Sequence, residues 1–509
     1  MKAKKAIGIL AVILLLAGLA AGGVAVYRER AARLAAEEHQ RQLDAVEEVT
    51  AVMRAEDLAS LAQYRNLKNV DARGSECYAE LLAYTLEHPE QTVLYSVPIG
   101  ERTVENTETE LTLAPADYDY DTLTANLRYL PAIRTITLPG TTLQADQIAA
   151  LRDAYPGTEI RYTVPLLGKE YRENTKKLDL TGLKSAQLEE AVTAMRLLPS
   201  LSRVELTDDE GGNTLSLEEL RTMQEAFPDV CFAYRFELFG QTVSTEDERI
   251  EYIRVPIGNE GVEELRRALP VLGKCSYFLL DNCKIDFELL SQLRDEFPAT
   301  KIVWRIWLTL SNFLTDIKIV HLTWTLTNQN VQILRYCNEV EYLDLGHNTL
   351  SDITFMGYMP NLKYVILSYN YVRDLSPLSN CKKLEMLELY FCHLLEDISP
   401  LAECESLKLL NISATKVHDI SPVFGLKKLE RFYCIMNYGI PEEQQEQIYE
   451  ELPDCWITFE QNISKAVGWS FDAAGGVRAQ WYLDMYKILR YRVEDYYFGY
   501  YPEEFENGA

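Results

Sequence analysis

The chain has 509 residues, of which 47% are hydrophobic and 25% are charged, and its formal net charge is −27. This length exceeds one ordinary compact core, so we expect several domains or an elongated repeat array. The negative charge excludes nucleic acid as the main partner, because a phosphate backbone needs Lys and Arg to replace its counterions, and it disfavours anionic lipid surfaces.

An uncharged segment from Ala6 to Tyr27 follows the leading MKAKK. As a helix, these 22 residues would reach about 33 Å, which just crosses a bilayer core. We favour an uncleaved transmembrane anchor at residues 1–27, with a single pass and the rest of the chain outside the cell. A signal peptide cleaved within the small residues 17–23 is the alternative.

A helical stalk is predicted for residues 28–64. The segment up to residue 63 contains no Gly or Pro and is rich in Ala, Glu, Arg and Leu, a composition typical of helices. An apolar stripe from Leu43 to Met53 suits either a short coiled coil or packing onto the next domain.

A long, loose repeat occupies residues 65–330. Four similar β-rich runs begin near Pro89, Pro156, Pro228 and Pro298, at spacings of 67, 72 and 70 residues. Between these runs the pattern alternates strand, turn and helix, as in IRTITL followed by QADQIAALRDAY. We expect irregular α/β units of about 70 residues, with two strand–helix steps in each.

A shorter and more regular repeat occupies residues 331–460. Its first apolar column is Val340, Leu362, Leu384, Leu407 and Leu429, at spacings of 22, 22, 23 and 22. The next two columns are Leu343, Val365, Leu387, Leu410 and Phe432, then Leu345, Leu367, Leu389, Ile412 and Cys434. Three residues on come Asn348, Asn370, Cys392, Thr415 and Asn437. This pattern, L-x-x-L-x-L-x-x-N/C-x-L, is that of a leucine-rich repeat.

Each column has a physical reason. A short strand places two apolar side chains in the core, and the following Asn, Cys or Thr offers a donor hydrogen to backbone carbonyls exposed where the chain bends. A tight turn such as Asp397-Ile398-Ser399-Pro400 then closes the coil. One repeat cannot bury its own apolar face, so the repeats stack.

The repeats within residues 338–440 resemble the 22-residue repeats of internalin-like bacterial leucine-rich-repeat proteins, above all in the D-I-S-P-L turn. The resemblance implies a surface that binds another macromolecule. We therefore expect an α/β leucine-rich-repeat solenoid, a curved array with short parallel strands, preceded by the transmembrane helix and stalk. The 70-residue units are interpreted as irregular leucine-rich-repeat-like steps of one continuous array.

Residues 461–509 are dense in aromatic side chains, and apolar residues stand at helical spacing at Trp481, Tyr482, Met485, Ile488 and Leu489. We favour a C-terminal capping region that covers the last repeat, because terminal repeats need a closed core. A separate docking element is the alternative.

No enzyme signature is found. The chain contains no Walker, G-x-G-x-x-G, G-x-S-x-G or H-E-x-x-H motif, and its six histidines form no metal-ligand pair. Cys392 and His393 are adjacent, but adjacent residues point apart, so no catalytic, metal or cofactor residues are assigned. The cysteines suit small buried positions, although a disulfide between Cys381 and Cys404 of neighbouring repeats stays open.

A binding face is predicted on the concave side of the regular repeats, where charged residues are scarce and Tyr, Met and Ile prevail as in interface cores. Its residues are Tyr342, Tyr364, Ile366, Tyr369, Met386, Tyr390, Phe391 and Tyr433. In the alternative, the C-terminal tail or the stalk folds over this face and hides it.

These observations lead to the hypothesis of a membrane-anchored leucine-rich-repeat protein that binds a protein partner at the cell surface. A glycan or cell-wall binding module is the alternative, because tyrosine faces also stack on sugars. An enzyme with an unrecognised site in residues 65–330 is the least favoured interpretation.

Overall fold

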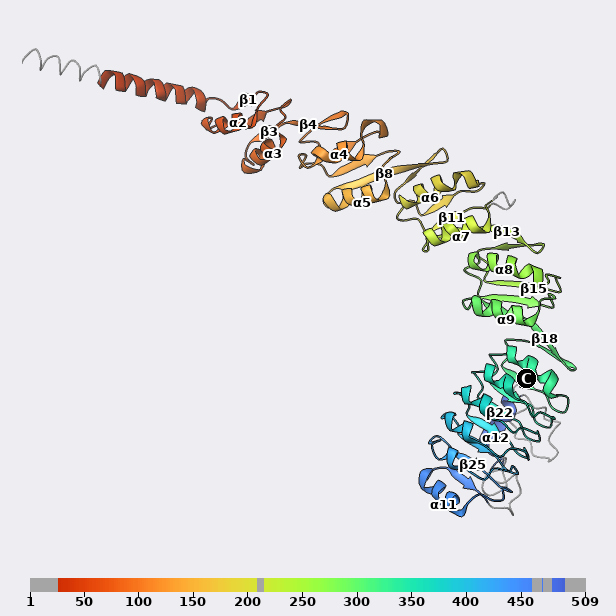
Figure 1. Ribbon diagram of the computed structural model, residues 1–509. Helices are drawn as coiled ribbons and strands as arrows, with labels where there is room; N and C mark the ends of the chain where they lie inside the picture. The colour runs from red at the N-terminus through yellow and green to blue at the C-terminus, as the bar shows by residue number, and fades with distance from the viewer. Residues whose placement is uncertain (1–25, 208–214, 460–468, 470–477, 490–509) are drawn as a thin grey trace, which may run out of the picture. The chain divides into compact units, whose positions relative to one another are not determined.

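The structure is a computed structural model that describes residues 26–207, 215–459, 469 and 478–489 (Figure 1). Residues 1–25 of the predicted anchor therefore lie outside the described residues. Among those that are described, no helix is both long and apolar enough to cross a membrane. The chain divides into two compact units, residues 1–233 and 234–509.

The predicted stalk is not one continuous helix, since its long helix covers residues 26–44 and ends there. Arg33 and Glu37, one turn apart on this helix, form an exposed ion pair at 3.2 Å. The chain then enters the first repeat unit, because the β-branched pair Val49-Thr50 suits a strand better than a helix. Residues 48–63 form a strand and a helical turn whose Leu58 and Leu61 are buried.

Four irregular units share one plan, in which three short parallel strands alternate with helices and an antiparallel hairpin follows (Figure 1). Helical connections allow successive strands to run parallel. The sequence predicted the two strand–helix steps and the closing β-rich run, and the structure adds that this run folds back as a hairpin. The boundary between the compact units falls inside the third unit.

The elements of the first unit are β1 (Glu48–Thr50), α2 (Ala55–Leu58), η1 (Ala59–Gln63), β2 (Asn69–Asp71), α3 (Tyr78–Glu87), β3 (Thr92–Leu94), β4 (Ser96–Ile99) and β5 (Arg102–Glu105). The elements of the second are β6 (Glu110–Thr112), η2 (Pro115–Asp117), α4 (Tyr120–Leu127), β7 (Thr135–Leu138), α5 (Ala145–Ala154), β8 (Glu159–Leu166) and β9 (Lys169–Arg172). In this unit β8 serves both the parallel sheet and the hairpin.

The elements of the third unit are β10 (Lys177–Asp179), η3 (Ser185–Gln187), α6 (Leu188–Arg196), β11 (Arg203–Glu205), α7 (Leu217–Ala226), β12 (Cys231–Ala233), β13 (Arg235–Leu238) and β14 (Gln241–Ser244). The elements of the fourth are β15 (Arg249–Ile253), η4 (Asn259–Gly261), α8 (Val262–Ala268), η5 (Leu269–Val271), β16 (Tyr277–Asp281), α9 (Phe287–Glu296), β17 (Lys301–Val303), β18 (Arg305–Leu308) and β19 (Ser311–Leu314).

A buried aromatic residue fixes the base of every hairpin. Its backbone N–H donates to the side-chain oxygen of a residue eleven positions later, and that residue's own N–H donates back to the aromatic carbonyl. The pairs are Tyr95 with Asn106, Tyr162 with Glu173, Tyr234 with Thr245 and Trp304 with Thr315. Buried backbone groups are thereby satisfied where the chain leaves the parallel sheet.

The regular repeats form a seven-stranded parallel sheet in sequence order (Figure 1). Its strands are β20 (Ile319–His321), β21 (Tyr342–Asp344), β22 (Tyr364–Ile366), β23 (Met386–Glu388), β24 (Leu409–Asn411), β25 (Arg431–Tyr433) and β26 (Trp456–Thr458). The connecting helices are α10 (Asn328–Val331), η6 (Gln332–Tyr336), η7 (Thr354–Tyr358), η8 (Ser376–Asn380), η9 (Ser399–Glu403), η10 (Ser421–Val423) and α11 (Glu442–Glu451), and α12 (Gln480–Leu489) follows the sheet. The sheet begins at 319, twelve residues before the predicted start of the regular repeats at 331.

The predicted columns are confirmed. Every residue of the two inner apolar columns is buried, with at most 1% of its surface exposed. The side-chain amide of Asn348 donates to three backbone carbonyls and that of Asn370 to two, while Cys392 and Thr415 each donate to one. At the closing turn, the Asp397 carboxylate accepts from the backbone N–H of Ser399 at 2.8 Å. The carboxylates of Asp352, Asp374 and Asp419 accept the equivalent hydrogen bond in their repeats.

Candidate functional site

The strand face is the side of the β20–β26 sheet that points away from the apolar columns. Since side chains alternate along a strand, the residues on either side of each inner leucine lie on this face. On β22 and β23 these residues are Tyr364, Ile366, Met386 and Glu388. The predicted binding residues of the strands lie on this face.

Trp469 and α12, from the chain's own C-terminal region, pack on the strand face. One apolar cluster joins buried residues of the sheet to Trp469 and α12, and α12 packs over β20 and β21. The buried members are Ile366, Met386, Leu409, Tyr433, Ile435, Trp469, Met485 and Leu489. This arrangement corresponds to the alternative in which the tail folds over the face, and α12 lies on the strands instead of simply closing the last repeat.

A polar contact fixes the cover in place. The Trp469 indole Nε1 donates to the Glu388 carboxylate at 2.7 Å, and the Ser368 hydroxyl donates to the same carboxylate at 2.8 Å. The Trp469 ring lies 6.0 Å from the Tyr433 ring and 4.7 Å from the Trp481 ring. Burial raises the pKa of Tyr433 to about 12 and that of Tyr482 on α12 well above its usual value, so both phenols are neutral at physiological pH.

The predicted binding residues thus fall into two groups. Ile366, Met386 and Tyr433 are buried beneath the C-terminal segment, and Tyr342 and Tyr364 are partly buried against it. The three buried side chains are not available to a partner while α12 is in place, whereas Tyr342 and Tyr364 keep part of their surface exposed. The other three, Tyr369, Tyr390 and Phe391, lie after the strands, and Phe391 is exposed.

A row of stacked rings, which we call the aromatic rim, follows the strand ends outside this cover. It consists of Trp324, His347, Tyr369 and Phe391. Successive ring centroids are 4.6, 4.4 and 5.1 Å apart, and the rings are nearly parallel. Trp324 and Phe391 are 75% and 41% exposed. The two ends of the rim are therefore solvent-accessible, while His347 and Tyr369 between them are partly buried.

The backbone of the aromatic rim is strained. All four rim residues have φ between 55° and 68°, the left-handed region that bulky side chains rarely occupy. Ala414 and Met436 continue the same column with φ values of 55° and 59°. Glycine or asparagine would adopt this turn most cheaply, and the left-handed conformation costs other residues about 1–2 kcal/mol. The left-handed conformation therefore belongs to the turn of each repeat, whatever side chain occupies it.

Sequence reasoning missed Trp324, because this residue precedes the predicted start of the regular repeats. The sequence nevertheless contains a pattern that could have identified this residue. The register of β20 with β21 pairs Val320 with Leu343, which places Trp324 in the same column as His347. Aligning KIVHLTW with the following repeats would have extended the rim by one ring.

A ladder of ion pairs runs beside the strand face. Glu341 contacts Lys318 and Lys363 at 3.1 and 2.6 Å, and Glu385 contacts Lys408 at 2.7 Å. Hydrogen bonds from Lys363 and Lys318 lower the pKa of Glu341. Exposed pairs of this kind are worth about 0–1 kcal/mol each, so the ladder sets the register of the repeats and is not a binding site.

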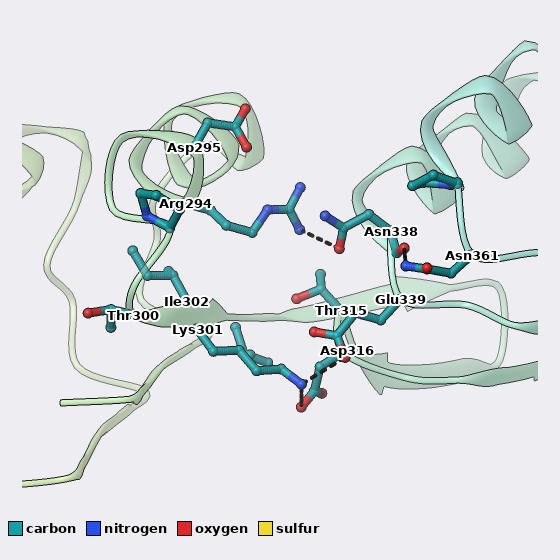
Figure 2. Close-up of a pocket in the computed structure, with 13 residues that line it drawn as sticks. Arg294, Asp295, Thr300, Lys301, Ile302, Thr315, Asp316, Asn338, Glu339 and Asn361 are labelled. Carbon is teal, nitrogen blue, oxygen red and sulfur yellow. Dashed lines mark hydrogen bonds and ion pairs between the residues drawn. The ribbon is translucent and has the colours of Figure 1, made fainter. Parts of the chain in front are cut away.

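A polar hollow of about 510 Å³ lies between α9, β17 and the loops before β20 and β21 (Figure 2). Lys301 Nζ is 2.8 Å from Glu339 and 3.4 Å from Asp316. Arg294 donates to the Tyr336 carbonyl at 2.8 Å and stacks on the Trp304 ring, and its burial lowers its pKa. Lys301 thus engages two of the three acidic side chains that line the hollow, Glu339 and Asp316, and these contacts join the last irregular unit to the regular repeats.

The cysteines are free thiols, including Cys381 and Cys404, for which a disulfide had been left open. Burial raises the pKa of Cys392 to about 12, and its thiol donates to the Leu367 carbonyl at 3.3 Å. This thiol therefore serves as a hydrogen-bond donor to the backbone, in the same column as Asn348 and Asn370, rather than as a nucleophile. Within the described ranges, no group of three or more His, Cys, Asp or Glu side chains could hold a metal ion.

Comparisons with known proteins agree with the repeat assignment. Residues 360–403 match the family model described as Leucine Rich repeats (2 copies), so the chain contains leucine-rich repeats. No curated protein matches the chain significantly.

Three solved structures illustrate what the fold is similar to. Internalin C2 from Listeria monocytogenes is 16% identical over 43% of this chain and 75% of its own, with a TM-score of 0.24. A second Listeria monocytogenes internalin is 12% identical over 83% of both chains, with a TM-score of 0.23. A leucine-rich-repeat protein from Leptospira interrogans is 15% identical over 83% of this chain and 98% of its own, with a TM-score of 0.25. No residue role transfers from these similarities.

Proposed function

We propose that this chain is a binding protein whose leucine-rich repeats recognise a protein partner at the cell surface, with residues 1–27 as the membrane anchor. Leucine-rich repeats generally act as scaffolds for binding and not for catalysis. The observation that carries the proposal is the aromatic rim, a row of four stacked rings of which Trp324 and Phe391 are exposed. Trp and Tyr are the residues that most often dominate binding energy at protein interfaces.

The geometry of the rim favours a protein over a glycan. A ligand that stacks on aromatic residues needs open ring faces, but His347 and Tyr369 each have parallel rings on both sides. At these two positions, neither ring face is open to a stacking ligand. Ring edges pack against aliphatic and aromatic side chains, as in edge-to-face pairs.

Replacing Tyr369 and Phe391 together by alanine should reduce recovery of the partner about tenfold or more, since truncating one interface hot spot costs about 2 kcal/mol. The repeat tolerates alanine in this column, because Ala414 already occupies it with the same backbone conformation. The full chain is produced in its own cells, cross-linked at the surface, and the captured proteins are quantified by mass spectrometry.

The matched control is Tyr358→Ala with Tyr449→Ala, which removes two aromatic side chains that are 61% and 50% exposed on η7 and α11, away from the rim. The control should capture as much partner as the wild type. Equal capture by the rim variant would contradict the proposal. Retention of the wild type on cell wall freed of protein, with loss in the rim variant, would replace the protein partner by a glycan.

The proposed anchor has its own test. Protease treatment of intact cells should remove a C-terminal epitope while a tag placed before Met1 stays protected, because only the repeats are then outside. A C-terminal epitope that survives until the cells are lysed would place the repeats inside and overturn the cell-surface assignment.

A further inference from the structure

The strand face under α12 is apolar and would not remain open. Ile366, Met386, Leu409 and Tyr433, on four successive strands, are each at most 7% exposed and belong to one apolar cluster with Trp469 and two residues of α12, Met485 and Leu489. Contiguous apolar patches of this kind mark sites that another element covers. Departure of α12 therefore requires a replacement with similar chemistry.

The occupant itself is a short amphipathic helix. Trp481, Met485 and Leu489 are spaced by four residues and form one stripe toward the sheet, with Tyr482 and Tyr486 beside it. An isolated helix of ten residues is marginal in water, so the helical state of α12 depends on the strand face. The face thus selects a helix with large apolar anchors at i, i+4 and i+8.

The fit of α12 to the face is incomplete. The indole Nε1 of Trp481 is buried and has no hydrogen-bond partner among the residues that the structure describes, whereas that of Trp469 donates to Glu388. A buried N–H without an acceptor disfavours the bound state of α12. A helix from another protein that fills the same pocket without this defect would bind the face better than α12 does.

We propose that the strand face of β20–β25 is a binding site for an amphipathic helix, that α12 is its internal occupant, and that a partner helix with Trp, Met and Leu anchors exchanges with α12. Docking of an amphipathic helix through anchors on one stripe is a recurring mode of protein recognition. The inference rests on the proposed function in taking the partner to be a protein, but its site is separate from the aromatic rim.

The covalent connection of α12 to the repeats determines how readily a free helix can replace it. Because α12 belongs to the same chain, its effective concentration at the face is of millimolar order, and a free helix must compete with it. Weakening α12 should therefore increase the affinity for a free helix without any change to the face.

The probe is a fluorescent peptide with the sequence of residues 479–489, AQWYLDMYKIL. The full chain carrying Met485→Asp, which places a carboxylate in the apolar cluster, should bind this peptide about 30-fold or more tightly than the wild type. Adding Met386→Asp, on the sheet side of the cluster, should abolish peptide binding. The rim variants Tyr369→Ala and Phe391→Ala should bind the peptide unchanged, so failure here and failure of the rim proposal are distinguishable.

A second measurement needs no substitution. Millimolar peptide added to the wild-type chain should accelerate amide hydrogen exchange across residues 480–489 while β20–β26 stay protected. Equal peptide affinity of the wild type and Met485→Asp, or unchanged exchange of α12 at millimolar peptide, would overturn the proposal and leave α12 as a permanent cover. Dimerisation of the wild type with α12 still protected would identify a second copy as the occupant and would also overturn it.

Discussion

Replacing Asn370 by alanine should lower the free energy of unfolding of the regular repeats by about 3 kcal/mol. Asn370 is 1% exposed, and its amide donates to the carbonyls of Leu345 and Leu367 at 2.8 and 2.9 Å. Its side-chain oxygen accepts from the backbone N–H of Leu350 at 2.9 Å. Alanine would leave all three buried backbone groups without these partners.

The loss is measured by urea denaturation of the full chain, followed by circular dichroism, with hydrogen exchange to confirm that the change lies in β21–β23. Asn370→Cys should cost less than Asn370→Ala, because Cys392 already shows that a thiol donates to one such carbonyl. Asn380→Ala, at an exposed position on η8 of the same repeat, should change stability by less than about 0.5 kcal/mol. A loss below about 1 kcal/mol for Asn370→Ala would contradict this expectation. It would mean that water or a backbone shift satisfies the three backbone groups in place of the Asn370 side chain.

The regular repeats were predictable because their determinants are local. A strand with two buried side chains and a following Asn, Cys or Thr recurs every 22 or 23 residues. The same local pattern can therefore be checked in each successive repeat. The cysteine and threonine in the ladder could be assigned by their donor hydrogens alone, and the hydrogen bonds of Cys392 and Thr415 confirm this reasoning.

The irregular units were predictable in period but not in detail. Proline spacing located them, yet the reciprocal bond between a buried aromatic residue and a polar side chain eleven positions later has no fixed residue type. The polar residue is Asn106 in the first unit and Glu173 in the second. It is Thr245 in the third unit and Thr315 in the fourth. Only the geometry shared by these residues identifies the hairpin.

The candidate site was the least predictable part. Aromatic columns on the strands were visible in the sequence, but whether Tyr433 meets a partner or Trp469 depends on packing between segments distant along the chain. The strain of the rim was also hidden. A left-handed backbone is usually signalled by glycine or asparagine, whereas Tyr369 and Phe391 adopt it with no such signal.

Replacing Gly100 by alanine should destabilise the first compact unit by about 4 kcal/mol, the largest effect expected from so small a change. Gly100 has φ of +57° at the tip of the β4–β5 hairpin, where an added Cβ would lie 1.9 Å from the carbonyl oxygen of Asp117. That carbonyl accepts from the backbone N–H of Glu101 at 2.7 Å, so the tip is held against the second repeat unit. Backbone on both sides must move to admit a methyl group.

Gly168→Ala is the matched control, since Gly168 also occupies a hairpin tip in the first compact unit, with φ of +77°, but nothing lies within 4 Å of its added Cβ. It should cost only about 1 kcal/mol, the penalty of the left-handed backbone itself. Urea midpoints separate the two variants, and hydrogen exchange of residues 96–127 locates the damage. Similar losses for both would show that backbone conformation, and not contact between successive repeat units, sets the requirement for glycine at position 100.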